Sequence, residues 1–255
     1  MAFLYGFLLS LIISVTAYYK KSLTLLGMLT AVVVGTLIYG FGSYITFTLL
    51  MVFFISSSLL TKLKEHKTSN GRGAIQVLAN SLATLLFSIA YHVTTNMGFL
   101  VVAAVSVAAT TADTWASEIG KMSKGKTFSI LTFKPIEKGT SGGVSTLGLF
   151  ASVMGSMVIA GVFLLLISIQ HGYEHTFLMY ALIIIGAGLL GSIIDSYLGI
   201  FIQAKYLDKT GCVIETFIRD QGLKLISGVR YINNDMVNLL MTLITTFMFT
   251  FILIV

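Results

Sequence analysis

Long apolar runs with almost no internal charge recur along the whole chain, and they constrain its fold more than any other feature. Of 255 residues, 56% are hydrophobic and only 10% are charged, which is too apolar for a soluble domain of this size. The runs are about 17–25 residues long, the length a helix needs to cross a bilayer. The sequence therefore predicts an all-α, polytopic transmembrane helix bundle with about eight spans (six to eight fit the pattern), forming a single transmembrane domain over residues 1–255. The expected spans are 3–19, 22–39, 44–61, 74–94, 97–116, 143–169, 176–203 and 236–254.

The basic residues alternate sharply between connections. All sixteen Lys and Arg residues fall in four of them: 20–21, 62–72, 121–138 and 205–230. The remaining connections, 40–43, 95–96 and 170–175, have none. The positive-inside rule places the basic connections in the cytoplasm and both termini outside. The net charge of +6 is thus one-sided, which suits a membrane surface or an anionic nucleotide; we expect no nucleic-acid partner.

The ends and the cysteine content add two limits. The first run lacks a preceding basic region and is followed by Lys20 and Lys21, so we interpret it as a retained helix and not a cleaved leader. The single Cys212 excludes an internal disulfide and a cysteine metal cluster. The sequence leaves a homo-oligomer open.

Residues 110–120 carry charge at the end of an apolar run. Asp113 and Ser117 are four residues apart, as are Thr114 and Glu118, so a helix would present them together. Charge in a span is costly and is usually functional. Carboxylate oxygens suit Mg²⁺; the alternative is a structural pair with a nearby lysine.

The next stretch, residues 120–127, fits the phosphate-loop expression G-x-x-x-x-G-K-[ST]. We reject the usual inference because that motif works between a buried strand and a helix, whereas here a transmembrane helix precedes it. Lys121, Lys124 and Lys126 remain candidates for contacts with phosphates.

A second loop, at residues 138–145, is rich in glycine and hydroxyl groups. Glycines free backbone N–H groups to converge on an anion, and the following helix start adds its positive dipole end. We predict an anion site here, against the alternative of a plain Gly/Ser helix start. Its members are Lys138, Gly139, Thr140, Ser141, Gly142 and Gly143.

Polar stripes at helical spacing mark three further spans at the same membrane face. They comprise Arg72, Gln76 and Asn80; Asp195 and Ser196 with Ser192, Gly199 and Gln203; and Asn234, Asp235 and Asn238. Together with residues 110–120 they predict a cytoplasm-facing pocket able to hold a metal, phosphates and a lipid headgroup.

Five ordered motifs between residues 70 and 240 resemble the family of the plant phytyl-phosphate kinase of tocopherol synthesis. They are Gln76 to Asn80, Ala112 to Gly120, Gly139 to Ser145, Asp195 to Gly199 and Asn234 to Asn238. The pattern Asp-Thr-x-Ala-Ser-x-x-Gly, followed by a basic loop and Gly-Thr, is also similar to dolichol kinases and membrane cytidylyltransferases. Both of those groups use CTP. Over residues 1–60 only the hydropathy matches.

This resemblance implies a CTP-dependent, Mg²⁺-dependent kinase that converts an isoprenoid monophosphate to the diphosphate. Asp113 is then the leading catalytic and metal-binding residue, with Glu118, Asp195 and Asp235 as candidates for a second ion. Residues 139–143 and Lys138 would cradle the nucleotide phosphates. Arg72, Asn80 and one or more of the lysines at 121, 124 and 126 would neutralise the acceptor phosphate. The other expected substrate contacts are Gln76, Thr114, Ser117, Ser196, Asn234 and Asn238.

Other functions fit parts of the same pattern. A polyprenol kinase would act on an alcohol and would need Asp113 or Asp195 as a general base. A lipid-phosphate cytidylyltransferase would release pyrophosphate. A transporter or lipid-phosphate flippase would use intramembrane carboxylates, but it predicts charges spread through the membrane depth, whereas these carboxylates lie near one surface.

Overall fold

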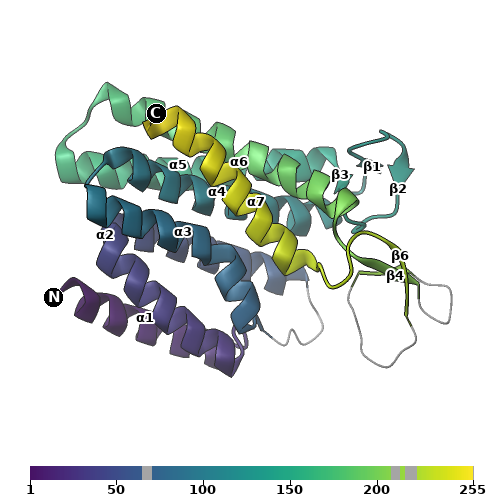
Figure 1. The fold of residues 1–255 in the computed structure, drawn as a ribbon, viewed down its shortest axis with the longest axis horizontal. Helices are drawn as coiled ribbons and strands as arrows, with labels where there is room; N and C mark the ends of the chain where they lie inside the picture. Colours follow the sequence, from purple (N-terminus) through teal and green to yellow (C-terminus); the bar gives the residue numbers. More distant parts are fainter. Residues whose placement is uncertain (65–70, 208–212, 216–222, 255) are drawn as a thin grey trace.

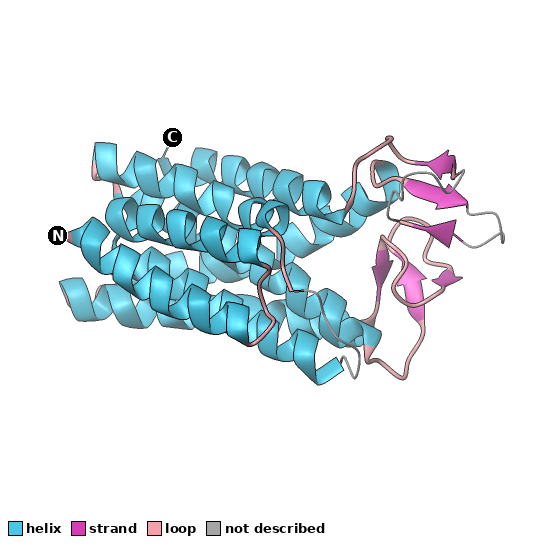
Figure 2. Cartoon of the chain, turned by 90° about the horizontal axis from the view of Figure 1, so that it is seen from below, coloured by secondary structure: helices cyan, strands magenta, loops and turns pink. Residues whose placement is uncertain are grey.

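The computed structural model describes residues 1–64, 71–207, 213–215 and 223–254 as a bundle of long helices with two small sheets at one end (Figures 1 and 2). The prediction of an all-α polytopic bundle is confirmed, since the described helices are long and apolar enough to cross a membrane. The helices are α1 (Ala2–Tyr19), α2 (Leu25–Lys64), α3 (Ala74–Thr94), α4 (Met97–Lys121), α5 (Thr146–His171), α6 (His175–Phe201) and α7 (Asn234–Ile254). Lys67, Lys209, Cys212 and Arg219 lie outside the described residues.

Helix α2 contains two spans because the backbone breaks at Ser43 (φ 71°, ψ 176°). A straight helix of 40 residues would be about 60 Å long, twice the hydrocarbon thickness. Instead, the rings of Tyr39 and Phe47 lie 5.4 Å apart across the break. At the far end, Lys62 Nζ donates to the Lys20 carbonyl at 3.0 Å. The two arms thus correspond to the spans predicted at 22–39 and 44–61.

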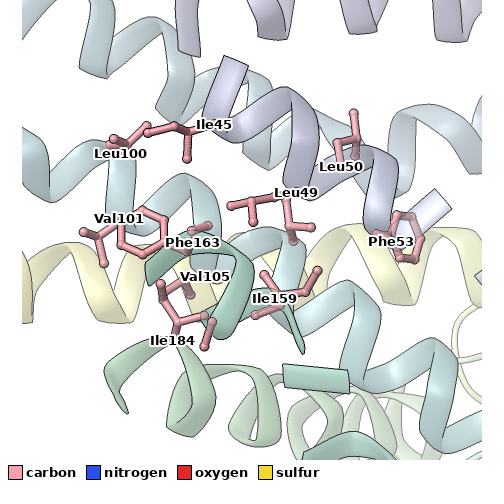
Figure 3. Packing of buried hydrophobic residues seen from close by; sticks show 14 of the residues in the cluster. Ile45, Leu49, Leu50, Phe53, Leu100, Val101, Val105, Ile159, Phe163 and Ile184 are labelled. Carbon is pink, nitrogen blue, oxygen red and sulfur yellow. The ribbon is translucent and has the colours of Figure 1, made fainter. Parts of the chain in front are cut away.

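Helix α4 lies at the centre of the bundle. Every residue from Leu100 to Ala112 is buried, and the helix packs against α2, α3, α5, α6 and α7. Figure 3 shows Val101 and Val105 of α4 among apolar side chains from α2, α5 and α6. A helix that is apolar on all sides is stable only when it is enclosed in this way. Its continuation past Ala112 places Asp113 in the middle of the assembly.

Small residues bring α6 unusually close to α4. A Cβ atom at Gly191 would lie 2.6 Å from the Ala109 Cβ atom, and one at Gly188 would lie 3.2 Å from the Ala108 carbonyl carbon. Such close approach is the ordinary use of glycine in membrane bundles. Because residues four apart share a helix face, the turn that follows this contact on each helix carries Asp113 and Asp195.

Two three-stranded antiparallel sheets, which the sequence did not predict, lie at the end of the bundle opposite the two termini (Figure 2). The first has the order β2-β1-β3, with Phe128 opposite both Pro135 and Val144. The second has the order β5-β4-β6, with Tyr206 opposite both Ile214 and Leu225. The strands are β1 (Thr127–Ser129), β2 (Pro135–Ile136), β3 (Gly143–Val144), β4 (Lys205–Leu207), β5 (Val213–Ile214) and β6 (Lys224–Ser227).

These sheets are built largely from the basic connections, which the bundle gathers at one end as the charge pattern predicted. The first two basic connections also meet there, since the Leu23 and Arg72 backbones form a bridge. Which membrane face this end occupies stays a prediction. Strands of two to four residues are too short to show an alternating apolar pattern, which explains why the sequence did not reveal them.

Candidate functional site

A pocket of about 520 Å³ opens at the sheet end of the bundle, between α4, α5, α6, α7 and the loop that precedes α5. Its volume is within the usual range of small-molecule sites, roughly 300–1,000 Å³, and its lining is mainly polar. The structure brings to it most of the residues that the sequence singled out. They are Gln76, Asp113, Ser117, Lys121, Gly139, Thr140, Ser141, Gly142, Gly143, Asp195, Ser196, Asn234 and Asp235.

Two carboxyl groups face each other in this pocket. The side chains of Asp113 on α4 and Asp195 on α6 are within hydrogen-bonding contact of each other, and the Lys121 ammonium acts electrostatically on Asp113. Both carboxyls line the pocket and are half-buried. Two ionised carboxylates at contact distance repel each other in a medium of low dielectric constant. A divalent cation between them would remove this repulsion.

The donor set fits Mg²⁺ if phosphates complete the coordination. Mg²⁺ in proteins usually takes one or two carboxylates, several waters and substrate phosphates. Asp113 and Asp195 supply the carboxylates, and Asp235 lines the same pocket. No group of three or more His, Cys, Asp or Glu side chains arranged for a metal ion occurs in the part of the chain that the structure describes.

A layer of amides supports Asp195 from behind. Asn238 is buried, and in the amide orientation that suits its neighbours its Nδ2 atom donates to Asp195 Oδ1 at 3.1 Å and to the Asn234 carbonyl at 3.2 Å. The amide of Asn80, on α3, lies 3.5 Å from that of Asn238. The two residues do not line the pocket themselves. Asn238 instead fixes the Asp195 side chain from α7, and Asn80 of α3 lies behind Asn238.

The glycine loop borders the pocket next to the first turn of α5. Gly139 and Gly142 have φ angles of +86° and +81°, which favour glycine. Ser145 caps the helix, because its Oγ atom accepts from Gly148 N at 3.1 Å. The predicted placement of the loop at a helix start is confirmed, and anion binding there stays a prediction.

Glu215 is a pocket residue that the sequence analysis missed. It accepts hydrogen bonds from the Ser141 backbone and hydroxyl at 3.0 and 2.6 Å and from Gln203 Nε2 at 3.0 Å. Nothing in its surroundings in the sequence marks it, because it follows the short strand β5 and belongs to no helical stripe. Thr127, Ser145, Ser192, Gln203 and Asn233 also line the pocket; of these, the helical spacing pointed only to Ser192 and Gln203.

Arg72 does not line the pocket. The prediction that it shares a helical stripe with Gln76 and Asn80 is wrong. Arg72 precedes α3, which begins at Ala74, so helical spacing does not apply to it. Its guanidinium lies 5.8 and 5.5 Å from the ring centroids of Phe53 and Phe54, and its Nη1 atom donates to Ser58 Oγ at 3.1 Å. Burial lowers the pKa of Arg72 to about 10, and the charge of Glu118 opposes this shift.

The remaining predicted residues do not line the pocket. Thr114 and Glu118 are on the neighbouring face of α4, and Glu118 interacts electrostatically with Arg72. Lys138 Nζ donates to the Ser123 carbonyl at 2.6 Å. Lys124 is exposed, and Lys126 borders a separate shallow groove.

The structure also explains why residues 120–127 are not a nucleotide-binding phosphate loop. Helix α4 ends at Lys121 and strand β1 begins at Thr127. The order is helix, loop, strand, the reverse of the arrangement that the motif requires. The rejection of that motif is confirmed.

The fold and the pocket define a class: a multi-pass membrane protein with a polar, carboxylate-containing pocket at one end of its helix bundle. The chain belongs to the family described as integral membrane protein DUF92, which it matches over residues 8–246. Its resemblance to a membrane family is thereby confirmed, and the match extends into the first spans.

Relatives from a plant, an archaeon and a cyanobacterium are similar to this chain in sequence. Protein PGR of Arabidopsis thaliana is 31% identical, over 96% of this chain and 94% of the relative. The uncharacterized membrane protein MJ0933 of Methanocaldococcus jannaschii is 30% identical, over 70% and 74%. The uncharacterized membrane protein sll0875 of Synechocystis is 27% identical, over 55% and 59%. None of these names states a reaction, and no solved structure was found to match the chain.

Proposed function

We propose that this protein is a CTP-dependent and Mg²⁺-dependent kinase that transfers a phosphoryl group to an isoprenoid monophosphate and forms the diphosphate. The observation that carries this proposal is the facing pair of Asp113 and Asp195 in one pocket with the glycine loop 139–143. A carboxylate pair beside a glycine-rich loop at a helix start is suited to metal-bound phosphates. The choice of CTP and of an isoprenoid acceptor comes from the motif resemblance.

In the proposed reaction, an oxygen of the acceptor phosphate attacks the γ-phosphorus of CTP. The bond from this phosphorus to the β,γ-bridging oxygen breaks, and CDP leaves. Such transfers depend mainly on positioning and on neutralising charge. Asp113 and Asp195 would hold Mg²⁺, which supplies positive charge to the phosphates, and Lys121 and the 139–143 loop would orient them.

The described residues that line the pocket include no histidine, and His66, the only histidine expected on the basic side, lies outside the described residues. A phosphate acceptor is already ionised and needs no general base. An alcohol acceptor would need one. Without a histidine, that base would have to be Asp113 or Asp195, the residues proposed to hold Mg²⁺, so the pocket suits a phosphate acceptor better than a prenol.

The distribution of charge supports surface chemistry over transport. Within the helical ranges that the structure describes, all Asp, Glu, Lys and Arg residues lie in the half of each helix next to the basic connections. A transport pathway would place ionisable groups at several depths.

A transfer assay tests the proposal. Purified protein in detergent receives CTP, ATP or GTP labelled at the γ-phosphate, Mg²⁺, and a series of prenols and prenyl monophosphates. The double variant Asp113→Asn/Asp195→Asn serves as the inactive control. We expect label in a prenyl diphosphate, dependence on Mg²⁺ and a preference for CTP.

Each of the other outcomes would indicate a different function for this protein. Label in a prenyl monophosphate would indicate an alcohol kinase, and release of pyrophosphate with CMP in the lipid would indicate a cytidylyltransferase. Absence of product from folded protein with every acceptor would contradict an enzymatic role and would favour transport.

A further inference from the structure

The glycine loop already holds an anion that belongs to the chain itself. The two carboxylate oxygens of Glu215 accept three hydrogen bonds, two from Ser141 and one from Gln203. Charge-assisted bonds of this kind, from a backbone N–H, a hydroxyl and an amide, are also those that bind phosphate oxygens. Glu215 therefore lies where the loop offers its donors to an anion.

The donors are held in place by the surrounding helices. Gly199 allows α6 to touch the loop, because a Cβ atom there would lie 3.2 Å from Ser141 Cβ and 3.3 Å from Gly142 N. Gln203 is only 3% exposed, so its amide needs a partner inside the protein. Lys205 Nζ lies 3.5 Å from the Ser141 carbonyl and adds positive charge. The donor set is thus rigid and requires an acceptor.

The charge balance of the pocket makes Glu215 an obstacle to a second anion. Its lining includes four carboxylate side chains, at positions 113, 195, 215 and 235, and one ammonium group, that of Lys121. A metal ion can neutralise Asp113 and Asp195, but Glu215 lies with the donors of the loop. A phosphate that used those donors would have to displace the carboxylate, since one N–H cannot serve two anions fully.

We infer that Ser141 and Gln203 form a phosphate subsite and that Glu215 occupies it as an internal competitor when no phosphate is bound. The ligand class is an oligophosphate. Its identification with the nucleotide phosphates rests on the proposed function, whereas the competition itself does not.

Binding measurements with inorganic triphosphate and with CTP, each with Mg²⁺, test this inference on the full-length protein in detergent. Glu215→Gln removes the negative charge and keeps the side-chain shape. Because the competitor is weakened, we expect the Kd for both ligands to fall by about three- to tenfold. Ser141→Ala, which removes one donor, should raise the Kd by a similar factor.

Glu137→Gln is the matched control. Glu137 is exposed on the neighbouring hairpin and does not line the pocket, so its variant has the same change in net charge without the local effect. Size-exclusion profiles confirm that each variant is folded. The inference requires tighter binding in Glu215→Gln than in Glu137→Gln.

A Kd that rises in Glu215→Gln would overturn the inference and would make Glu215 a supporting residue of the loop. An unchanged Kd, or no triphosphate binding to any variant, would overturn it as well. If triphosphate binding tightens but no lipid is phosphorylated in the transfer assay, the proposed function fails and the phosphate subsite stands. If a lipid is phosphorylated in the transfer assay but Glu215→Gln does not tighten triphosphate binding, the kinase stands and the competitor role of Glu215 fails.

Discussion

Among the hollows lined by the described helices, two differ in almost every property. The larger one lies among α4 to α7, is mainly polar and contains the paired carboxyls of Asp113 and Asp195. The smaller one, of about 60 Å³, lies among α1, α2 and α3 and is almost entirely apolar, with Arg72 as its charged residue. Asn80 lines the smaller hollow and contacts Asn238 behind Asp195, so it connects the two.

The difference separates charge used for chemistry from charge used for structure. In the larger hollow, carboxyls face open space and each other, a costly arrangement that a ligand would relieve. In the smaller one, the Arg72 guanidinium is packed on aromatic rings and hydrogen-bonded to Ser58, so its interactions are largely satisfied within the protein. Three substitutions test this separation.

The largest effect is expected at the carboxyl pair. Asp113→Asn removes a charge that we assign to metal and phosphate binding, and we expect kcat/KM for phosphoryl transfer to fall by about 10²–10³-fold or more. Glu118→Gln, five residues further along α4, changes the same charge outside the pocket and should cost less than about tenfold. Both rates are measured with labelled CTP and the preferred acceptor. Equal losses in the two variants would abolish the distinction between the hollows.

A smaller effect is expected where α6 approaches α4. Gly191→Ala places a Cβ atom 2.6 Å from that of Ala109, so the helices must separate and carry Asp195 away from Asp113. Overpacking of this kind costs about 1–3 kcal/mol of stability. We expect a lower midpoint of thermal unfolding, followed by intrinsic fluorescence, together with reduced transfer activity. The control is Gly186→Ala, since a Cβ atom there meets nothing within 4 Å.

If Gly191→Ala and Gly186→Ala behave alike, the spacing of α4 and α6 does not set the geometry of the carboxyl pair. A loss of activity without a loss of stability in Gly191→Ala would show that the pair tolerates even less displacement than the fold does.

How much of the fold and of the site the sequence predicts depends on how close together in the chain the residues of each signal lie. Span positions came from hydropathy, which depends on runs of residues, and the reversal at Ser43 matches the gap between two predicted spans. Asp113, Ser117 and Asp195 were found because helical spacing applies to residues inside a helix. Arg72 was misplaced because it precedes the helix, where that spacing has no meaning.

Glu215 and the two sheets mark the limit of such reasoning. Glu215 meets Ser141 across 74 positions of the chain, a contact that depends on how two hairpins fold over the same helix ends. Strands of two to four residues carry no periodic pattern. Glu118 illustrates a further limit. Its spacing predicts that it shares a helix face with Thr114, but only the packing of α4 shows that this face is next to the one that lines the pocket.

Arg72 offers the smallest but sharpest test of the comparison. Arg72→Gln removes the hydrogen bond to Ser58 and the contacts with two rings, and it takes away a charge that interacts with Glu118. After the cost of burying the guanidinium is subtracted, we expect a loss of about 1–2 kcal/mol in stability, with the KM for the acceptor changed less than about threefold. Lys134→Gln, an exposed position on the first hairpin, provides the same change in charge. The opposite pattern, an unchanged unfolding midpoint with a KM raised tenfold or more, would mean that Arg72 binds the acceptor phosphate as the sequence alone suggested. The smaller hollow would then be part of the substrate site, with Asn80 at the boundary where the lipid phosphate meets the carboxyl pocket.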